Sequence, residues 1–386
     1  MGPCPLANLF EEHIEMSKQQ ALGKLVILGA GVLVGACLVM IWGERGQARA
    51  ARRDAIAESA QVPKANGQAE SGPGWKKGTG WGWIWGKDDE VGSLNALSSA
   101  SRAAALAQAT RGDVFDLGLT YSRRSFKWPG HSPGEIITFR SPDGVHRMKD
   151  ADAPPVEKNA DLVYWHSAAL FISDNVATQI DGLAHITAGR DFHWYNGFKE
   201  DDWGGDWGPR KCDAPTIPPI IARGVLIDVA AYKKVEALPG HTVISTQDLR
   251  DTLAWEGVSL APGDVVLVRT GTGRFWGEDG ADHATIAEHD SAGPDLEATK
   301  WLVAENGAIM VASDTSGFEV NPPPGTPGTG IPVHRYLLVD QGVHLGEFHY
   351  LEGLSQAKAY TFCYVAAVNK IKGAAAGFAL RPLALR

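Results

Sequence analysis

The chain has 386 residues, of which 44% are apolar and 21% are charged. Both fractions are typical of globular proteins and exclude collagen-like, coiled-coil and wholly disordered chains. The formal net charge is −9, from 36 basic and 45 acidic side chains. Since the sequence shows neither a basic surplus nor a basic stripe, we expect no nucleic-acid partner.

The first apolar element is an uncharged run at residues 25–42. At ~1.5 Å per residue, a helix of this length spans roughly 27 Å, close to the ~30 Å hydrocarbon core of a bilayer. Two interpretations fit: an uncleaved membrane anchor, or a signal peptide with a small-x-small cleavage site at Ala48-Arg49-Ala50. We therefore predict a leader at 1–24, a transmembrane or signal helix at 25–43, a flexible linker at 44–74 and one large domain at 75–386.

The charges beside this run leave its orientation open. Lys18 and Lys24 precede it, whereas four arginines follow it within residues 45–53. By the positive-inside rule this asymmetry keeps the C-terminal side in the cytoplasm, whereas a cleaved export signal would place the large domain in the periplasm. We predict a membrane-anchored or exported protein, with a cytoplasm-facing anchor as the alternative.

The large domain alternates predicted helices and strands. Thr246 is a suitable helix cap, and Gly307 and Gly342 are suitable helix ends. Apolar runs such as V-V-L-V and A-I-M-V-A are typical of strands that are covered on both faces. In chain order we expect a helix at 98–109, strands at 114–120 and 224–229, a helix at 246–254, a strand at 264–270, a helix at 295–306, a strand at 308–313, a helix at 334–340 and a strand at 360–368. This mixture predicts an α/β domain.

The 13 tryptophans are unevenly distributed. Four of them cluster where the large domain begins, at positions 75, 81, 83 and 85, which predicts that this opening segment docks onto the domain body. Two more lie in the long loop 199–211. We expect that loop to pack on a partner subunit or to cover a pocket.

Several other polar residues are expected to have structural roles. Cys212 and Cys363 are far apart and no CxxC pair occurs, which excludes a disulfide scaffold and a four-thiolate zinc site. Arg269, at a strand end, is expected in a structural salt bridge, with contact to an anionic substrate as the alternative. His131 lies in a Pro/Gly-rich stretch that we place on a lid loop.

A first polar cluster, D-N-V-A-T-Q-I-D-G-L-A-H, occupies residues 174–185. In an extended chain Gln179 and Asp181 share a face, and Gly182 permits a turn before His185. A carboxylate beside an imidazole can bind a metal or transfer protons. A solvated aspartate and a packed histidine are the structural alternative.

A second polar cluster, H-R-Y-L-L-V-D-Q-G-V-H-L-G-E, occupies residues 334–347. Here a helix that begins near His334 leads through Gly342 to a short strand that carries Glu347. Histidine and glutamate are a common ligand pair for divalent metals. Nearby, Asp314 ends a buried strand, where α/β proteins often place their sites, or else caps the following turn.

Taken in order, these segments resemble the cyclase superfamily, the metal-dependent group that includes bacterial kynurenine formamidase and isatin hydrolase. The resemblance covers about residues 80–370. It begins with D-D-E-V-G-S-L-N at 88–95, continues through T-Q-I-D-G-L-A-H and W-Y-N-G, and ends with V-R-T-G, S-D-T, P-V-H and G-E. It implies a single domain of the swivelling β/β/α type behind the N-terminal helix.

The family pattern H-x-G-T-H-x-D-x-P-x-H is only partly present. Aligned on Thr178, its two metal-binding histidines fall on Asn175 and Gln179, whereas Asp181 and His185 match. The family's later histidine and glutamate ligands resemble His334 and Glu347. The resemblance therefore implies four metal ligands: Asp181, His185, His334 and Glu347. The predicted cofactor is a divalent metal, Mn²⁺ or Zn²⁺, of open identity and number, although so many oxygen donors favour Mn²⁺, Mg²⁺ or Ca²⁺.

The function that the resemblance implies is metal-dependent hydrolysis of an amide C–N bond in a small aromatic or cyclic substrate. The predicted catalytic residues are His185, a general base and then acid, together with Asp181 and Gln179, the last orienting water or acting as a weak ligand. His193, Trp194 and Tyr195 are predicted to wall the substrate pocket, with core or dimer packing as the alternative.

Two other functions remain open. One is a lyase or cyclase acting on a hydroxy-acid or polyketide-like substrate. The other is a membrane-tethered protein that binds a small molecule without catalysis. Because members of the family assemble into dimers or tetramers, the resemblance also implies a homodimer or homotetramer.

Overall fold

The computed structural model describes residues 74–131, 133–148, 159–277, 282–325, 330–377 and 380–386. The predicted leader, the predicted transmembrane or signal helix and all but the last residue of the predicted linker lie outside these ranges. Within the described ranges, no helix combines the length and the apolar character needed to cross a bilayer.

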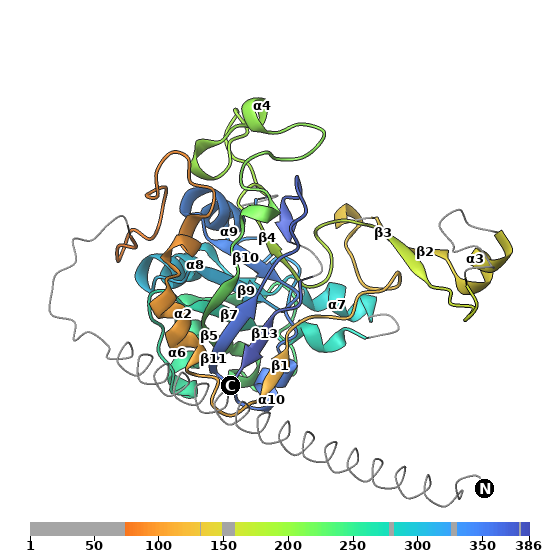
Figure 1. The fold of residues 1–386 in the computed structure, drawn as a ribbon. Coiled ribbons are helices and arrows are strands. Elements are labelled where there is room, and N and C mark those ends of the chain that lie inside the picture. Colours follow the sequence, from red (N-terminus) through yellow and green to blue (C-terminus); the bar gives the residue numbers. More distant parts are fainter. Residues whose placement is uncertain (1–73, 132, 149–158, 278–281, 326–329, 378–379) are drawn as a thin grey trace, which may run out of the picture. The chain divides into compact units, whose positions relative to one another are not determined.

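A nine-stranded mixed sheet runs through the domain (Figure 1), in the order β1-β13-β11-β5-β7-β9-β10-β4-β12. Its four central strands are parallel: β5 (Ile220–Asp228), β7 (Val265–Arg269), β9 (Met310–Ser313) and β10 (His344–Glu347). Antiparallel strands complete its two sides: β1 (Val114–Asp116), β13 (Leu383–Leu385) and β11 (Thr361–Ala366) beside β5, and β4 (Gln179–Asp181) and β12 (Ala376–Gly377) beside β10. The predicted α/β class is confirmed.

The central strands are covered on both faces, as their apolar runs predict. All five residues of β7 are buried, as are all four of β9. Figure 1 shows α2 (Ser99–Leu106), α6 (Thr246–Glu256) and α8 (Leu296–Lys300) beside these strands. The other α-helices of the described residues are α3 (Pro142–Met148), α4 (Glu200–Trp203), α5 (Val229–Tyr232), α7 (His283–His289), α9 (Pro332–His334) and α10 (Glu352–Gln356).

Helix boundaries follow local capping chemistry. The cap of α6 is Ser245 and not the predicted Thr246, because the Ser245 hydroxyl accepts a hydrogen bond from the Asp248 amide while the Asp248 carboxylate bonds back. Beyond α9 the chain continues as a π-helical segment, Arg335–Gln341, and stops at Gly342, whose φ is +63°. A Cβ at Gly342 would overlap the Tyr195 ring, so this predicted helix end is confirmed with a packing reason.

The tryptophans of the opening segment dock onto the body as predicted. The indole nitrogens of Trp75, Trp81 and Trp83 donate to the backbone oxygens of residues 303, 308 and 339, at 2.8, 2.9 and 2.6 Å. Trp81 also stacks on Trp85, with ring centroids 6.3 Å apart. These contacts fasten the segment to the helical layer.

A separate hairpin was not predicted. It pairs β2 (Gly134–Arg140) with β3 (Ser167–Ile172) as a two-stranded sheet outside the main one. The side chains of Ile137, Phe139 and Phe171 are more than half exposed there. Because apolar residues occupy both faces of the hairpin, the alternation that marks a half-buried strand is missing.

Candidate metal centre

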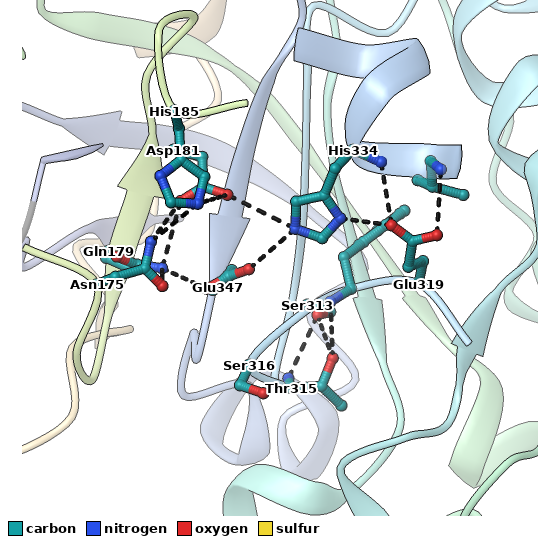
Figure 2. Close-up of polar contacts among 12 residues, drawn as sticks. Asn175, Gln179, Asp181, His185, Ser313, Thr315, Ser316, Glu319, His334 and Glu347 are labelled. Atoms are coloured by element: carbon teal, nitrogen blue, oxygen red, sulfur yellow. Dashed lines mark hydrogen bonds and ion pairs between the residues drawn. The ribbon is translucent and has the colours of Figure 1, made fainter. Parts of the chain in front are cut away.

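Three buried side chains converge where β4 and β10 meet. The antiparallel register places Gln179 opposite Glu347, and Asp181 lies two residues further along β4 on the same face. His334, at the end of α9, faces both carboxylates (Figure 2). One ligand atom each from Asp181, His334 and Glu347 lies within 4.8 Å of the others.

One carboxylate oxygen of the cluster has no hydrogen-bond partner. His334 Nε2 lies 3.5 Å from Glu347 Oε1 and 3.7 Å from Asp181 Oδ2, beyond hydrogen-bond distance. Asp181 Oδ2 is buried and accepts no hydrogen bond. A buried carboxylate oxygen without a partner is costly, and a bound cation removes that cost. One imidazole nitrogen and two carboxylate oxygens therefore fit a divalent metal.

Glu319 holds His334 in place from behind. Its Oε1 accepts hydrogen bonds from His334 Nδ1 at 2.5 Å and from the His334 backbone N–H at 3.1 Å. Its Oε2 accepts from the Val333 amide at 3.1 Å. With the proton on Nδ1 bound to Glu319, Nε2 is turned toward the two carboxylates. This is the arrangement that protein sites use to orient a metal-binding histidine.

The electrostatics of the cluster favour a cation. Burial opposes charge on His334, but the hydrogen bond to Glu319 and the charges of Asp181 and Glu347 outweigh it and raise its pKa to about 10. Burial and the charge of Asp181 raise the pKa of Glu347, and His334 offsets part of that rise. The raised pKa values favour protonated His334 and Glu347 in the metal-free site, so a metal must displace these protons.

His185 lies beside the three-residue cluster rather than within it. Its Nε2 is 3.9 Å from Asp181 Oδ2 and 3.3 Å from the Asn175 amide nitrogen. Its side chain is 27% exposed, so it can be reached from outside. His131 is close enough that the charges of Asp181 and His185 act on its pKa, which burial lowers.

Two buried amides join the cluster at the positions where the family pattern has histidines. Gln179 Nε2 donates to Asn175 Oδ1 at 2.9 Å and to Glu347 Oε2 in a short contact. Asn175 Nδ2 donates to Asp181 Oδ1 at 3.2 Å. Both amides are therefore part of the site.

A cavity of about 290 Å³ adjoins His334 and Glu319. On its wall, Asp290 accepts hydrogen bonds from the Trp128 indole and the Ser316 amide, each at 2.8 Å. Burial raises the pKa of Asp290, and the bonds to Ser316 and Trp128 offset part of that rise. Behind Trp128 is a group of aromatic rings: Phe126 (5.3 Å from Trp128), Phe348 (6.2 Å from Phe126) and Trp276 (5.2 Å from Phe348).

Comparison with known proteins decides the family. The model of the family described as putative cyclase matches residues 115–320, more than half of the chain. The chain belongs to this cyclase family. No curated protein matches it at a significant level.

Solved structures share the fold of this chain. A crystal structure described as a novel cyclase is 26% identical, with a TM-score of 0.67, and covers 79% of this chain and 98% of its own. Isatin hydrolase A from Ralstonia solanacearum is 21% identical, with a TM-score of 0.52 and coverages of 75% and 99%. An isatin hydrolase bound to the product analogue thioisatinate is 18% identical, with a TM-score of 0.53 and the same coverages. The predicted cyclase-type fold of the domain is confirmed.

The structure places two of the three residues predicted to wall the substrate pocket in the core. Trp194 and Tyr195 are buried in the main core, and the Tyr195 hydroxyl donates to Asp89 at 2.6 Å. His193 is partly exposed but bonds to Asp191 at 2.8 Å. None of the three lines the cavity beside His334. The Tyr195 bond joins the W-Y-N-G segment to the opening motif at 88–95, which agrees with the packing alternative.

Two other polar residues have structural roles. Arg269 forms buried ion pairs with Asp228 and Glu352, both at 2.8 Å, as expected. Asp314 accepts hydrogen bonds from the amides of Thr270 and Gly271, both at 2.8 Å, so it caps the turn after β7 and not the turn that follows its own strand. Cys212 and Cys363 are buried free thiols.

Sequence patterns did not indicate several residues of the site. Glu319 lies 15 residues before its partner His334, in a loop without a pattern that marks it. Trp128, Asp290 and Ser316 come from three distant segments and meet only in the folded chain. For Phe348, its place directly after Glu347 was the one available signal.

Proposed function

We propose that this member of the cyclase family is a metal-dependent hydrolase that cleaves an amide C–N bond in an aromatic or cyclic substrate. The observation that carries the proposal is the buried cluster of Asp181, His334 and Glu347, with an unpartnered carboxylate oxygen beside an imidazole that Glu319 orients. These three residues would hold the metal, Mn²⁺ or Zn²⁺. When bound, such an ion polarises a carbonyl group and lowers the pKa of water.

His185 is the acid–base residue of this proposal. The Asn175 amide nitrogen has only hydrogens to offer, so His185 Nε2 accepts from it and the ring proton sits on Nδ1. To act as the base, Nε2 exchanges its hydrogen bond from Asn175 for one from the attacking water and takes that proton. It then returns the proton to the amine that leaves.

The cavity beside His334 supports a flat substrate. Its aromatic wall is Trp128, whose indole nitrogen is fixed by Asp290. Because His334 belongs both to the cavity lining and to the three-residue cluster, a substrate in the cavity would lie next to the metal.

A substrate panel tests the proposal. The full chain, loaded with Mn²⁺, is assayed with an aromatic formamide, with isatin, with a lactone and with a hydroxy acid. Isatin is included because two structural neighbours are isatin hydrolases. Hydrolysis of an amide bond supports the proposal. Conversion of a hydroxy acid without hydrolysis supports a lyase or cyclase, and binding without turnover supports the binding protein.

A further inference from the structure

The two buried amides form a continuous chain of hydrogen bonds between the carboxylates. Gln179 Nε2 donates to Glu347 Oε2 and to Asn175 Oδ1. Asn175 Nδ2 in turn donates to Asp181 Oδ1. The contacts fix the amide orientations, because each amide nitrogen faces acceptors and Asn175 Oδ1 faces a donor.

This series of hydrogen bonds gives the two oxygens of each carboxylate different partners. Glu347 Oε2 and Asp181 Oδ1 are taken by the amides, whereas Glu347 Oε1 and Asp181 Oδ2 face His334 Nε2, at 3.5 and 3.7 Å. A carboxylate that rotated freely would not keep one oxygen directed at His334 Nε2. The hydrogen bonds from the two amides prevent this rotation.

We infer that Gln179 and Asn175 are positioning residues that orient the carboxylates of a single-ion site, and that neither binds the ion. The inference rests on the metal of the proposed function. It assigns the ion to Asp181, His334 and Glu347 and gives Gln179 a role in place of the predicted weak ligand. Gln179 Oε1, which is buried without a partner, then remains available to a water molecule or a substrate N–H.

Substitution of Gln179 separates a positioning residue from a ligand. Gln179→Glu keeps the size of the side chain, replaces the donor with a carboxylate oxygen and sets it against Glu347 Oε2. A positioning role predicts that Mn²⁺ affinity falls by about tenfold or more, because outer partners of metal ligands typically contribute 10–100-fold. A ligand role predicts tighter binding, because a charged oxygen replaces a neutral one.

The measurement is calorimetric titration of Mn²⁺ into the chelator-treated full chain. Gln179→Met, which removes the donor without adding charge, should also weaken binding by about tenfold. Gln341→Met is the matched control: the Gln341 side chain accepts from the Trp81 amide outside the cluster, so its loss should leave Mn²⁺ affinity unchanged.

A crystal structure of the Mn²⁺-loaded wild-type chain gives a second readout that does not depend on how the variants fold. The inference predicts bonds from the ion to Asp181, His334 and Glu347, with Gln179 Oε1 beyond the ~2.6 Å reach of a metal–oxygen bond. Tighter binding by Gln179→Glu, or a bond from Oε1 to the ion, would overturn the inference and leave the proposed function standing. Absence of binding of both Mn²⁺ and Zn²⁺ by the wild-type chain would overturn both.

Discussion

His334 can contribute a metal ligand only because Glu319 fixes its ring. We predict that Glu319→Gln lowers Mn²⁺ affinity by about tenfold, since an amide can place a donor N–H against the Nδ1 proton and release the ring. Equilibrium dialysis against Mn²⁺ measures the effect, and circular dichroism checks the fold. Unchanged affinity would show that the ring is held by other contacts.

His185 should affect the reaction more than it affects the metal. We predict that His185→Ala lowers kcat by about 10²–10⁴-fold, the usual contribution of a general acid–base, while Mn²⁺ affinity stays within a few-fold of wild type. The reason is its position outside the three-residue cluster, 3.9 Å from Asp181 Oδ2. Parallel kinetics and dialysis measure the two effects. Retained activity would refute the base role, and lost metal would make His185 the ligand that the family resemblance implies.

For single residues, the sequence indicates which side chains can bind a metal or transfer protons, but not which of them lie close together in the fold. Asp181, His334 and Glu347 stand out as ligand types, and the structure brings them together. The contact between Gln179 and Glu347 joins residues 168 positions apart, and local patterns do not specify such pairing. Trp194 and Tyr195 are buried, and the sequence left their role open because a dense aromatic segment looks the same whether it lines a pocket or packs in a core.

Two short strands, β4 and β10, position the side chains of the site. β4 has three residues and β10 has four, yet their register sets Gln179 opposite Glu347. Apolar runs predicted β7 and β9 because those strands are buried on both faces. Because β4 is polar, the sequence did not identify it as a strand. The expectation that Gln179 and Asp181 share a face is nevertheless consistent with the register.

The end of α6 contains a carboxylate that ties stability to pH. Burial raises the pKa of Glu256 to about 8; a hydrogen bond from the Asp228 amide lowers it in part, and the Asp228 charge raises it. Since the folded pKa exceeds the unfolded value, the folded state keeps its proton longer. The stability from this group is therefore complete below about pH 4.5 and is lost as pH rises through about 8.

Glu256→Gln removes this dependence because an amide does not ionise. We predict that the variant is more stable than wild type by about 2–4 kcal/mol at pH 9 and nearly equal to it at pH 4.5. Urea unfolding at the two pH values measures the difference. A variant less stable than wild type at pH 9 would contradict the assigned pKa shift.

At the scale of the whole molecule, the hairpin bears on assembly. Two isolated strands are marginally stable in water, and this hairpin exposes Ile137, Phe139, Leu170 and Phe171. We propose that it packs against a second copy of the chain, in line with the predicted homodimer or homotetramer. Phe171→Glu should then shift the mass measured by light scattering toward the 41.3 kDa of one chain. A wild-type chain that is already monomeric would refute the proposal.

Class and family were accessible from the sequence, whereas the hairpin and the cavity were not. The alternation of helices with apolar strands reflects a sheet covered on both sides, which composition and period report directly. The cavity wall of Trp128, Asp290 and Ser316 arises from loops, whose paths depend on contacts between distant segments. Localisation stays a prediction, because the apolar run at 25–42 lies outside the described residues.

The central claim is that Asp181, His334 and Glu347 bind a divalent metal on which hydrolysis depends. The most direct test is the metal content of the full chain after incubation with Mn²⁺ and desalting, measured for wild type and for Asp181→Ala. We predict one ion per wild-type chain and at least about a hundredfold weaker binding in the variant, since one of three protein ligands is lost. No bound ion in wild type, or equal content in the two chains, would contradict the account.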